Sequence, residues 1–466
     1  MMSVALTAEA KVLPPSSPES RLPLPLCVGF GIGSFGIAIL LNVVTVLFPA
    51  MMTTVLGQSA AVAGLLLTFS KLYDIGADVA IGAASDRTRT RIGRRRPYLL
   101  FGAAVSGISF LMIFIPPKLT GTPLALWMGL ALVVYSTGYS LFSVPYMAMA
   151  GEMTDGYHER TRLLSFRTFF ISVGQLAASA GAAALIGWFG GGSLGYAVMG
   201  VVAGVLLSGT MMISFFGTRN ARMMPATPKA RISRRELVST LTSNRPFVLL
   251  MAIKLSQYVA IAMISTTKVL FLLNVVKVGY AGLVNLTLIQ NVVAVVAIPL
   301  WVALGRRIGK RPAYLLATAM LGVVYVSWFF TDVNITMTGI LLRGAANGVA
   351  AAGTTLLSVA MLPDVMEYDR LRTGLRREGV FSSVYSIVEK LGYALGAGII
   401  GVILSASGFL PSLQGKLVVQ PHSAMLALYG GASLIPASLI LLSWLLMLAY
   451  PLDDKMLRRT QLLQAR

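Results

Sequence analysis

The segment KLYDIGADVAIGAASDRTRTRIGRRRPY, residues Lys71–Tyr98, decides the fold, because it begins in an apolar stretch and ends in a dense basic loop. Asp74 and Asp78 lie four residues apart, a spacing that places both carboxylates on one face of a helix. Lys71 precedes Asp74 by three residues and lies on the same side. A charge at the centre of a bilayer costs about 2.5–3.5 kcal/mol on insertion scales. Three such charges on one face therefore indicate a functional site inside a membrane helix.

The basic loop that follows marks the point where the chain leaves the bilayer. Asp86 can pair with an arginine at the end of the span and so hold one conformation closed. The alternative is that these charges only anchor the topology. On the first interpretation we predict a gating loop of Asp86, Arg87 and Arg91, with Arg307 in a second, matching loop.

The composition excludes a soluble globular protein, since 56% of the residues are hydrophobic and only 12% are charged. Apolar runs of about 20 residues, each long enough to cross a bilayer, recur along almost the whole chain. The predicted fold is therefore an all-α integral membrane protein with twelve transmembrane helices. The spans are expected at 26–50, 60–84, 98–115, 123–150, 163–189, 194–216, 246–276, 280–304, 312–330, 335–362, 380–407 and 422–450.

The net charge of +21 reflects topology, because the basic residues lie in short loops between apolar runs. One set of loops, together with both tails, carries nearly all of them, whereas the other set holds little more than Lys118, Lys277 and Lys416. The positive-inside rule then predicts a multi-pass protein of the cell membrane, in a bacterium the inner membrane, with both termini in the cytoplasm. This charge distribution gives no indication of nucleic-acid binding.

The chain repeats itself, because RIGRRRPYLL at Arg91–Leu100 resembles RIGKRPAYLL at Arg307–Leu316. Both segments follow an even-numbered span, so we predict two homologous six-helix halves that meet around a pathway at mid-membrane depth. The expected divisions are a disordered cytoplasmic tail (1–25), an N-terminal half (26–216), a central cytoplasmic loop (217–245), a C-terminal half (246–450) and a second cytoplasmic tail (451–466).

A few other charges also fall within the predicted spans, namely Arg167, Lys254, Lys268, Arg343, Glu389 and Lys390. They either line a polar pathway or act as structural ion pairs and residues near an interface. Glu389 and Lys390 point about 100° apart on a helix, so only one of them can face a given partner. We expect Lys390 to face the pathway. The predicted pathway lining is Asn42, Tyr73, Tyr146, Arg167, Gln175, Gln257, Tyr258, Asn291 and Lys390.

Enzymatic activity and a bound cofactor are not expected, because the sequence has no P-loop, GxSxG or HExxH motif. One cysteine, Cys27, and two histidines make a Cys- or His-based metal site improbable. No aqueous domain is large enough for an ATPase, so any transport must run on an ion gradient. We expect a monomer in the bilayer that binds a small-molecule solute.

The helix-two segment with its D-x-T-R-x-R-x-G-[KR]-x-[KR]-P loop resembles the glycoside–pentoside–hexuronide:cation symporter family of the major facilitator superfamily, which includes melibiose permease. The segments SVPYMAMAGEMTDGYHERTRLLSFRTFF and MLPDVMEYDRLRTGLRREGVFSSVYSIVEKLGYALGAGI are similar to this family as well. The resemblance implies a major facilitator fold and cation-coupled sugar symport by alternating access. It further implies that Asp74 and Asp78 bind the coupling cation, Na⁺ or H⁺, that Arg167 lies near the sugar, and that Lys390 lies near the cation site.

Three features depart from the family pattern and leave the substrate open. The helix-four acid of its sugar transporters is Ser143 here, and the aromatic residue that follows in galactoside carriers is Met147. The helix-one acid is missing too, which argues against a galactoside. One alternative is a lysolipid or other amphipathic solute carried on the same fold. Another is a non-transporting sensor or assembly factor.

Overall fold

The computed structural model describes residues 22–154, 157–221, 244–373, 377–416 and 418–452, and within these ranges the chain forms helices and no strands. Twelve helices are long and apolar enough to cross a membrane, as the sequence predicts. Helical geometry suits this solvent, because it pairs the backbone amides and carbonyls within each span. Only one isolated β-bridge, Leu56 to Leu413, occurs in the described part of the chain.

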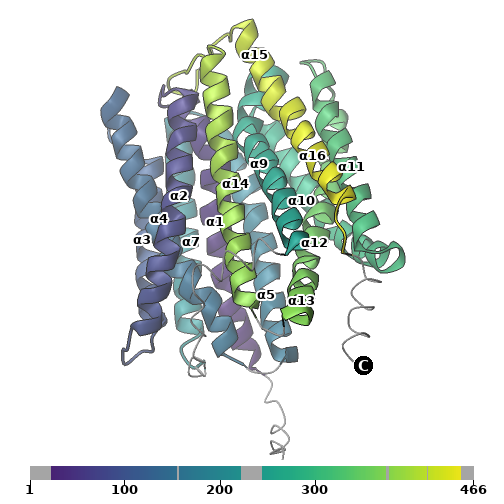
Figure 1. Cartoon of the computed structure of the whole chain (residues 1–466). Helices are drawn as coiled ribbons and strands as arrows, with labels where there is room; N and C mark the ends of the chain where they lie inside the picture. Colours follow the sequence, from purple (N-terminus) through teal and green to yellow (C-terminus); the bar gives the residue numbers. More distant parts are fainter. Residues whose placement is uncertain (1–21, 155–156, 222–243, 374–376, 417, 453–466) are drawn as a thin grey trace, which may run out of the picture.

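The first six spans form the N-terminal helices (Figure 1). They are α1 (Leu24–Thr54), α2 (Ala60–Arg87), α3 (Arg96–Phe114), α4 (Gly121–Glu152), the continuous α5 (Tyr157–Leu176), η1 (Ala177–Gly181) and α6 (Ala182–Trp188), and α7 (Ser193–Gly217). The side chain of Ser59 caps the start of α2 by accepting a hydrogen bond from the amide of Val62.

The last six spans form the C-terminal helices. They are α9 (Arg245–Phe271) with η2 (Leu272–Val276), α10 (Gly279–Ile308), α11 (Lys310–Ser327) with η3 (Trp328–Phe330), α12 (Met337–Ala360) with α13 (Leu362–Thr373), α14 (Glu378–Ala406), and α15 (His422–Tyr429) with η4 (Gly430–Leu434) and α16 (Ile435–Leu448). Asn244 and Thr336 cap α9 and α12 in the same way as Ser59 caps α2.

The predicted span boundaries agree with the structure to within a few residues except beside two polar segments. The tenth span does not stop near Leu362, because the chain continues as α13 to Thr373. The fifth starts at Tyr157, six residues before the expected position. Both extensions carry charged residues, so a prediction that follows apolar runs ends before the helix does. The expected disordered tail and central loop lie largely outside the described residues.

The two groups of helices lie side by side and meet chiefly where α2 packs against α14 (Figure 1). α1 also contacts α9, and α10 contacts η1 and α6. Near one end the α2–α14 contact is backbone to backbone, because a Cβ atom at Gly64 would lie 3.1 Å from the Cα of Gly401. Small residues permit this close approach between membrane helices.

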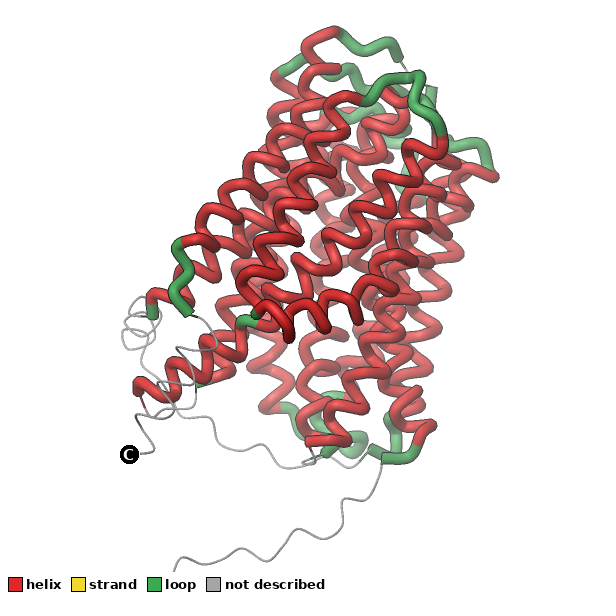
Figure 2. Tube along the Cα trace, turned by 90° about the vertical axis from the view of Figure 1, so that its right-hand side faces the viewer, coloured by secondary structure: helices red, strands yellow, loops and turns green. Residues whose placement is uncertain are grey.

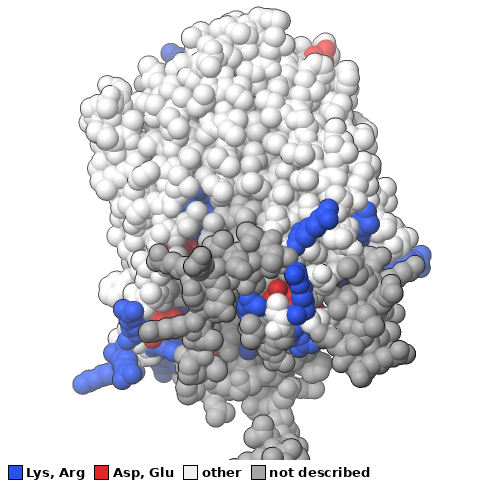
Figure 3. Space-filling view, viewed as in Figure 1, with Lys and Arg blue, Asp and Glu red and all other residues white. Residues whose placement is uncertain are grey.

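The two ends of the bundle differ in charge. We call the end that carries Arg87, Arg94, Arg307 and Lys310 the basic end, and the other the opposite end. Figure 3 shows Lys and Arg side chains gathered over the lower part of the molecule and an upper part almost free of charge. The bundle is wider at its lower end in the view of Figure 2.

The opposite end is closed by hydrogen bonds between the two groups. The amide of Ser412 donates to the carbonyl of Thr53 over 2.7 Å, and that of Gly415 donates to Thr54 over 2.9 Å. The hydroxyls of Tyr196 and Tyr280 lie 2.9 Å apart. At the basic end, by contrast, every ion pair formed by described residues joins side chains of the same group. Among the described residues, hydrogen bonds between the two groups therefore close the opposite end, whereas no ion pair at the basic end crosses between the groups.

Candidate functional site

The two acids of α2 lie on the face that contacts α4 and α14, as their spacing predicts. Asp78 accepts a hydrogen bond from the Ser140 hydroxyl of α4 over 2.6 Å. Its other carboxylate oxygen lies 2.5 Å from the Lys390 ammonium of α14. Asp78 therefore links the two groups of helices through a charged contact at mid-depth.

Asp74 is fully buried, and neither of its carboxylate oxygens has a hydrogen-bond partner among the described residues. Its Oδ2 lies 3.6 Å from the Lys71 Nζ and 3.9 Å from the Lys390 Nζ. Lys71 thus pairs with Asp74, a question that the sequence leaves open. A buried carboxylate with unused acceptor oxygens is costly unless a cation or a proton satisfies it.

Lys71, Asp74 and Lys390 border a cavity of about 310 Å³ between the two groups of helices, whereas Asp78 does not line it. Four predicted site residues line it: Asn42 of α1, Asp74 of α2, Gln175 of α5 and Lys390 of α14. Lys71 lines it as well. Gln175 is exposed, so solvent can reach this wall.

Further polar residues that the predicted lining leaves out also line the cavity, namely Thr45, Tyr139, Ser265, Ser386, Glu389 and Tyr393. Glu389 and Lys390 both line the cavity, although adjacent residues point in different directions on a helix. Lys390 points toward α2, and the cavity extends far enough around α14 to include Glu389 as well. The sequence contains a pattern that could have indicated a polar face of α4, because Ser136, Tyr139 and Ser140 recur at helical spacing. Ser136 bonds Ser70 of α2 over 2.9 Å, next to the contact of Ser140 with Asp78.

The other predicted pathway residues do not line this cavity. The Tyr146 hydroxyl donates to the carbonyl of Phe30, and the Tyr146 ring stacks on that of Phe30 within the packed N-terminal helices. Tyr73 bonds Thr137 on the exposed side of α2. Arg167 is partly buried on α5.

Three more residues of the predicted pathway lining form hydrogen bonds elsewhere in the bundle. Tyr258 bonds the Tyr385 hydroxyl beside the buried Lys254. Gln257 donates to the Tyr314 hydroxyl, and Asn291 donates to the Ser179 hydroxyl.

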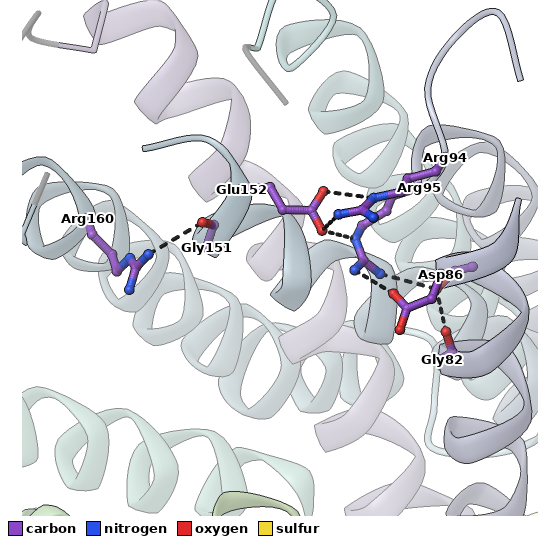
Figure 4. A network of polar contacts seen from close by, with 8 residues as sticks. Gly82, Asp86, Arg94, Arg95, Gly151, Glu152 and Arg160 are labelled. Atoms are coloured by element: carbon purple, nitrogen blue, oxygen red, sulfur yellow. Dashed lines mark hydrogen bonds and ion pairs between the residues drawn. The ribbon is translucent and has the colours of Figure 1, made fainter. Parts of the chain in front are cut away.

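The predicted gating loop contains an ion-pair network, but its arginines are not the expected ones. Asp86 pairs with Arg95 over 2.8 Å, and Arg94 and Arg95 both bind Glu152 at the end of α4, over 2.7 and 2.6 Å (Figure 4). Arg87 and Arg91 are exposed and form no ion pair with a described residue. A run of arginines does not reveal which members turn inward, so the sequence could not choose Arg95.

The repeated loop motif has the same backbone in both groups. Gly93 and Gly309 both adopt positive φ, +101° and +92°, which favours glycine. The next residue is a cation in each case, and Lys310 pairs with Asp364 just as Arg94 pairs with Glu152. Arg307, the predicted gating residue of this loop, is exposed.

Two groups of six helices around a charged cavity define a membrane transporter of the major facilitator type. The family model described as MFS/sugar transport protein matches residues 29–454, so the chain belongs to that family. A symporter named sll1374 from Synechocystis is 26% identical over 91% of this chain and 93% of its own length. A glucuronide carrier protein homologue from Escherichia coli is 29% identical, covering 86% and 87%, and an isoprimeverose transporter from Lactiplantibacillus pentosus is 25% identical, covering 84% and 82%.

Solved structures share the fold. A bacterial homologue of the human lysosomal transporter Spinster, in an inward-facing and unoccupied conformation, aligns with a TM-score of 0.68 over 92% of this chain and 98% of its own, at 17% identity. A mutant of the nucleoside transporter NupG aligns with a TM-score of 0.66 at 12% identity, over 91% and 99%.

Proposed function

We propose that the protein is a secondary active transporter that couples the inward movement of Na⁺ or H⁺ to symport of a sugar- or glycoside-like solute. The observation that carries this proposal is the cavity between the two groups of helices, with a buried acid, Asp74, whose oxygens have two lysines nearby but no hydrogen-bond partner among the described residues. Several relatives are named as symporters or sugar carriers, which supports the same class of activity.

The cation binds at Asp74 and Asp78. Carboxylate oxygens are the ligands that hard cations prefer, and the same groups can take up a proton where burial disfavours their charge. A bound cation competes with Lys390 for these carboxylates. Binding therefore weakens the contact between α2 and α14 and frees the two groups of helices to move.

The solute binds in the cavity beside the cation. The volume of the cavity, about 310 Å³, lies at the lower end of the range for small-molecule pockets. Asn42 and Gln175 offer amide groups, Tyr139 and Tyr393 offer aromatic rings, and Glu389 offers an acceptor for hydroxyl groups. This combination suits a hydroxyl-rich solute better than an aliphatic chain.

The basic end faces the cytoplasm, because the positive-inside rule assigns the loops rich in Lys and Arg to that side. Both termini are then cytoplasmic, and contacts that close the opposite end correspond to an inward-open state. Alternating access requires these contacts to break while the basic end closes.

Competition between solutes tests the substrate class. Proteoliposomes loaded with a labelled glucuronide would be assayed for exchange against external glycosides, pentosides, uronides and lysolipids. We expect a sugar or uronide to accelerate exchange and lysolipids to have no effect at concentrations that leave the vesicles intact. Exchange driven only by lysolipids would replace the proposed substrate with an amphipathic one.

A further inference from the structure

A second cavity of about 30 Å³ lies inside the C-terminal helices and shares no lining residue with the larger cavity. Five polar side chains from different segments line it: Lys268 of α9, Gln290 of α10, Tyr325 of α11, Trp328 of η3 and Asn347 of α12. The rest of the wall is apolar, formed by Ile264, Phe271, Leu272, Leu286 and Ala432.

All five polar side chains carry N–H or O–H donors, and none of them makes a hydrogen bond to another described residue. The rings of Tyr325 and Trp328 are buried, at 4% and 8% exposure. Buried polar groups in folded proteins are nearly always hydrogen-bonded. Lys268, Gln290 and Asn347 are half-buried, so five donors without a described protein partner surround one small space, where an acceptor would satisfy them.

The charge around this cavity is positive. Lys268 forms no ion pair with a described residue, and no aspartate or glutamate lines the wall. Arg343 adds a second cation nearby, with its guanidinium 5.6 Å from the centre of the Trp328 ring. An unpaired cation within a membrane bundle is costly, so a negative occupant would offset this cost.

We propose that this cavity binds one small monovalent anion of the size of chloride. The space of about 30 Å³ is enough to admit a sphere of the size of a water molecule or a chloride ion. A water molecule would accept hydrogen bonds from two donors but would leave the charge of Lys268 unpaired.

The anion bridges four spans, since its donors come from α9, α10, the α11–η3 span and α12. Its binding therefore stabilises the packing of the C-terminal helices against one another. This role is independent of the coupling cation, whose acids lie on α2 and contact α14.

Thermal unfolding of the full-length protein in detergent tests the proposal. Melting would be followed in sodium chloride, bromide, acetate and gluconate at equal ionic strength. Because a ligand that binds only the folded state stabilises it, we expect Tm to be higher by about 2 °C or more in chloride and bromide than in gluconate. Lys268→Met should abolish this difference, whereas Lys254→Met, which changes the other lysine of α9, should retain it.

Asn347→Leu provides a second variant if Lys268→Met does not fold, and we expect it to weaken the chloride effect. Equilibrium binding of radioactive chloride to the purified protein gives a direct measure, with one ion bound in the parent and none in Lys268→Met. Equal melting in chloride and gluconate would overturn the proposal, as would an unchanged chloride effect in Lys268→Met. A larger rise in acetate than in chloride would also overturn it, in favour of a carboxylate site.

Discussion

Two charged clusters in this protein differ in what they connect. Lys390 of α14 contacts Asp74 and Asp78 of α2, so this cluster joins the N-terminal to the C-terminal helices. Arg94 and Arg95, in the loop before α3, bind Glu152 of α4 at the basic end, so this cluster lies within the N-terminal group alone. The first cluster must rearrange when the two groups move, whereas the second can persist throughout. The difference suggests that ion coupling belongs to the first and rigidity of one group to the second.

The repeated loops differ in a related way. The N-terminal loop ties Arg95 to acids at the ends of two helices, Asp86 and Glu152. In the C-terminal loop Val302 stands where Asp86 stands in the repeat, and Arg311 donates instead to the last carbonyls of α16, at Met447 and Leu448. The same backbone turn is thus stabilised by a network of ion pairs in the N-terminal group. In the C-terminal group it is stabilised by one ion pair and by hydrogen bonds from Arg311 to the end of α16.

Loss of the cation that joins the two groups should have the largest effect. We expect Lys390→Gln to lower gradient-driven uptake by about tenfold or more, which corresponds to about 1.4 kcal/mol or more. The reason is that Asp78 loses the cation that balances it in the empty state, while Asp74 keeps only Lys71. Lys310→Gln, whose lysine pairs with an acid of its own group, is the matched control and should transport normally. Equal losses in both variants would remove the distinction between the clusters.

Loss of the shared acid of the N-terminal network should mainly affect stability. Glu152→Gln leaves Arg94 and the buried Arg95 without this carboxylate, so we expect a cost of about 3 kcal/mol in the free energy of unfolding. Asp364→Asn, in the more exposed C-terminal pair, should cost at most about 1 kcal/mol. Denaturation in detergent measures both, and a larger cost for Asp364→Asn would reverse the comparison.

Overpacking at the opposite end should disfavour its closed state. A valine at Gly64 would press on Gly401 of α14, which we expect to cost about 1–3 kcal/mol in the state that is closed at this end. Labelling of Ser386→Cys on the cavity wall by an impermeant thiol reagent from the basic side should then slow, with little background because Cys27 is buried. Gly76→Val is the control on the same helix, since a Cβ there meets no atom within 4 Å. Faster labelling in Gly64→Val would contradict the account.

Removal of the Tyr73 hydroxyl should have the smallest effect. Tyr73→Phe loses one exposed hydrogen bond to Thr137 and no contact with the cavity. We expect uptake within twofold of the parent. A large loss of uptake would restore Tyr73 to the pathway, where the sequence interpretation had placed it.

The sequence predicted the twelve spans well because each apolar run is long and the intervening loops are short and polar. The sequence also singled out Asp74, which lines the cavity, since charges within a span stand out from an apolar background. The sequence could not predict which residues from distant helices meet. Glu389 was left out, and Tyr146 was assigned to the pathway although its hydroxyl is satisfied by Phe30 in the packed core. Residues 222–243, in the predicted central loop, lie outside the described residues.

The central claim is that Asp74 and Asp78 couple cation binding to solute movement. Its most direct test is solute uptake into vesicles under an imposed Na⁺ gradient or an imposed H⁺ gradient, with Asp74→Asn and Asp78→Asn beside the parent. We predict that one gradient drives uptake in the parent and that neither gradient does so in either variant, while exchange without a gradient persists in at least one of them. Gradient-driven uptake that is unchanged in both variants would contradict the claim.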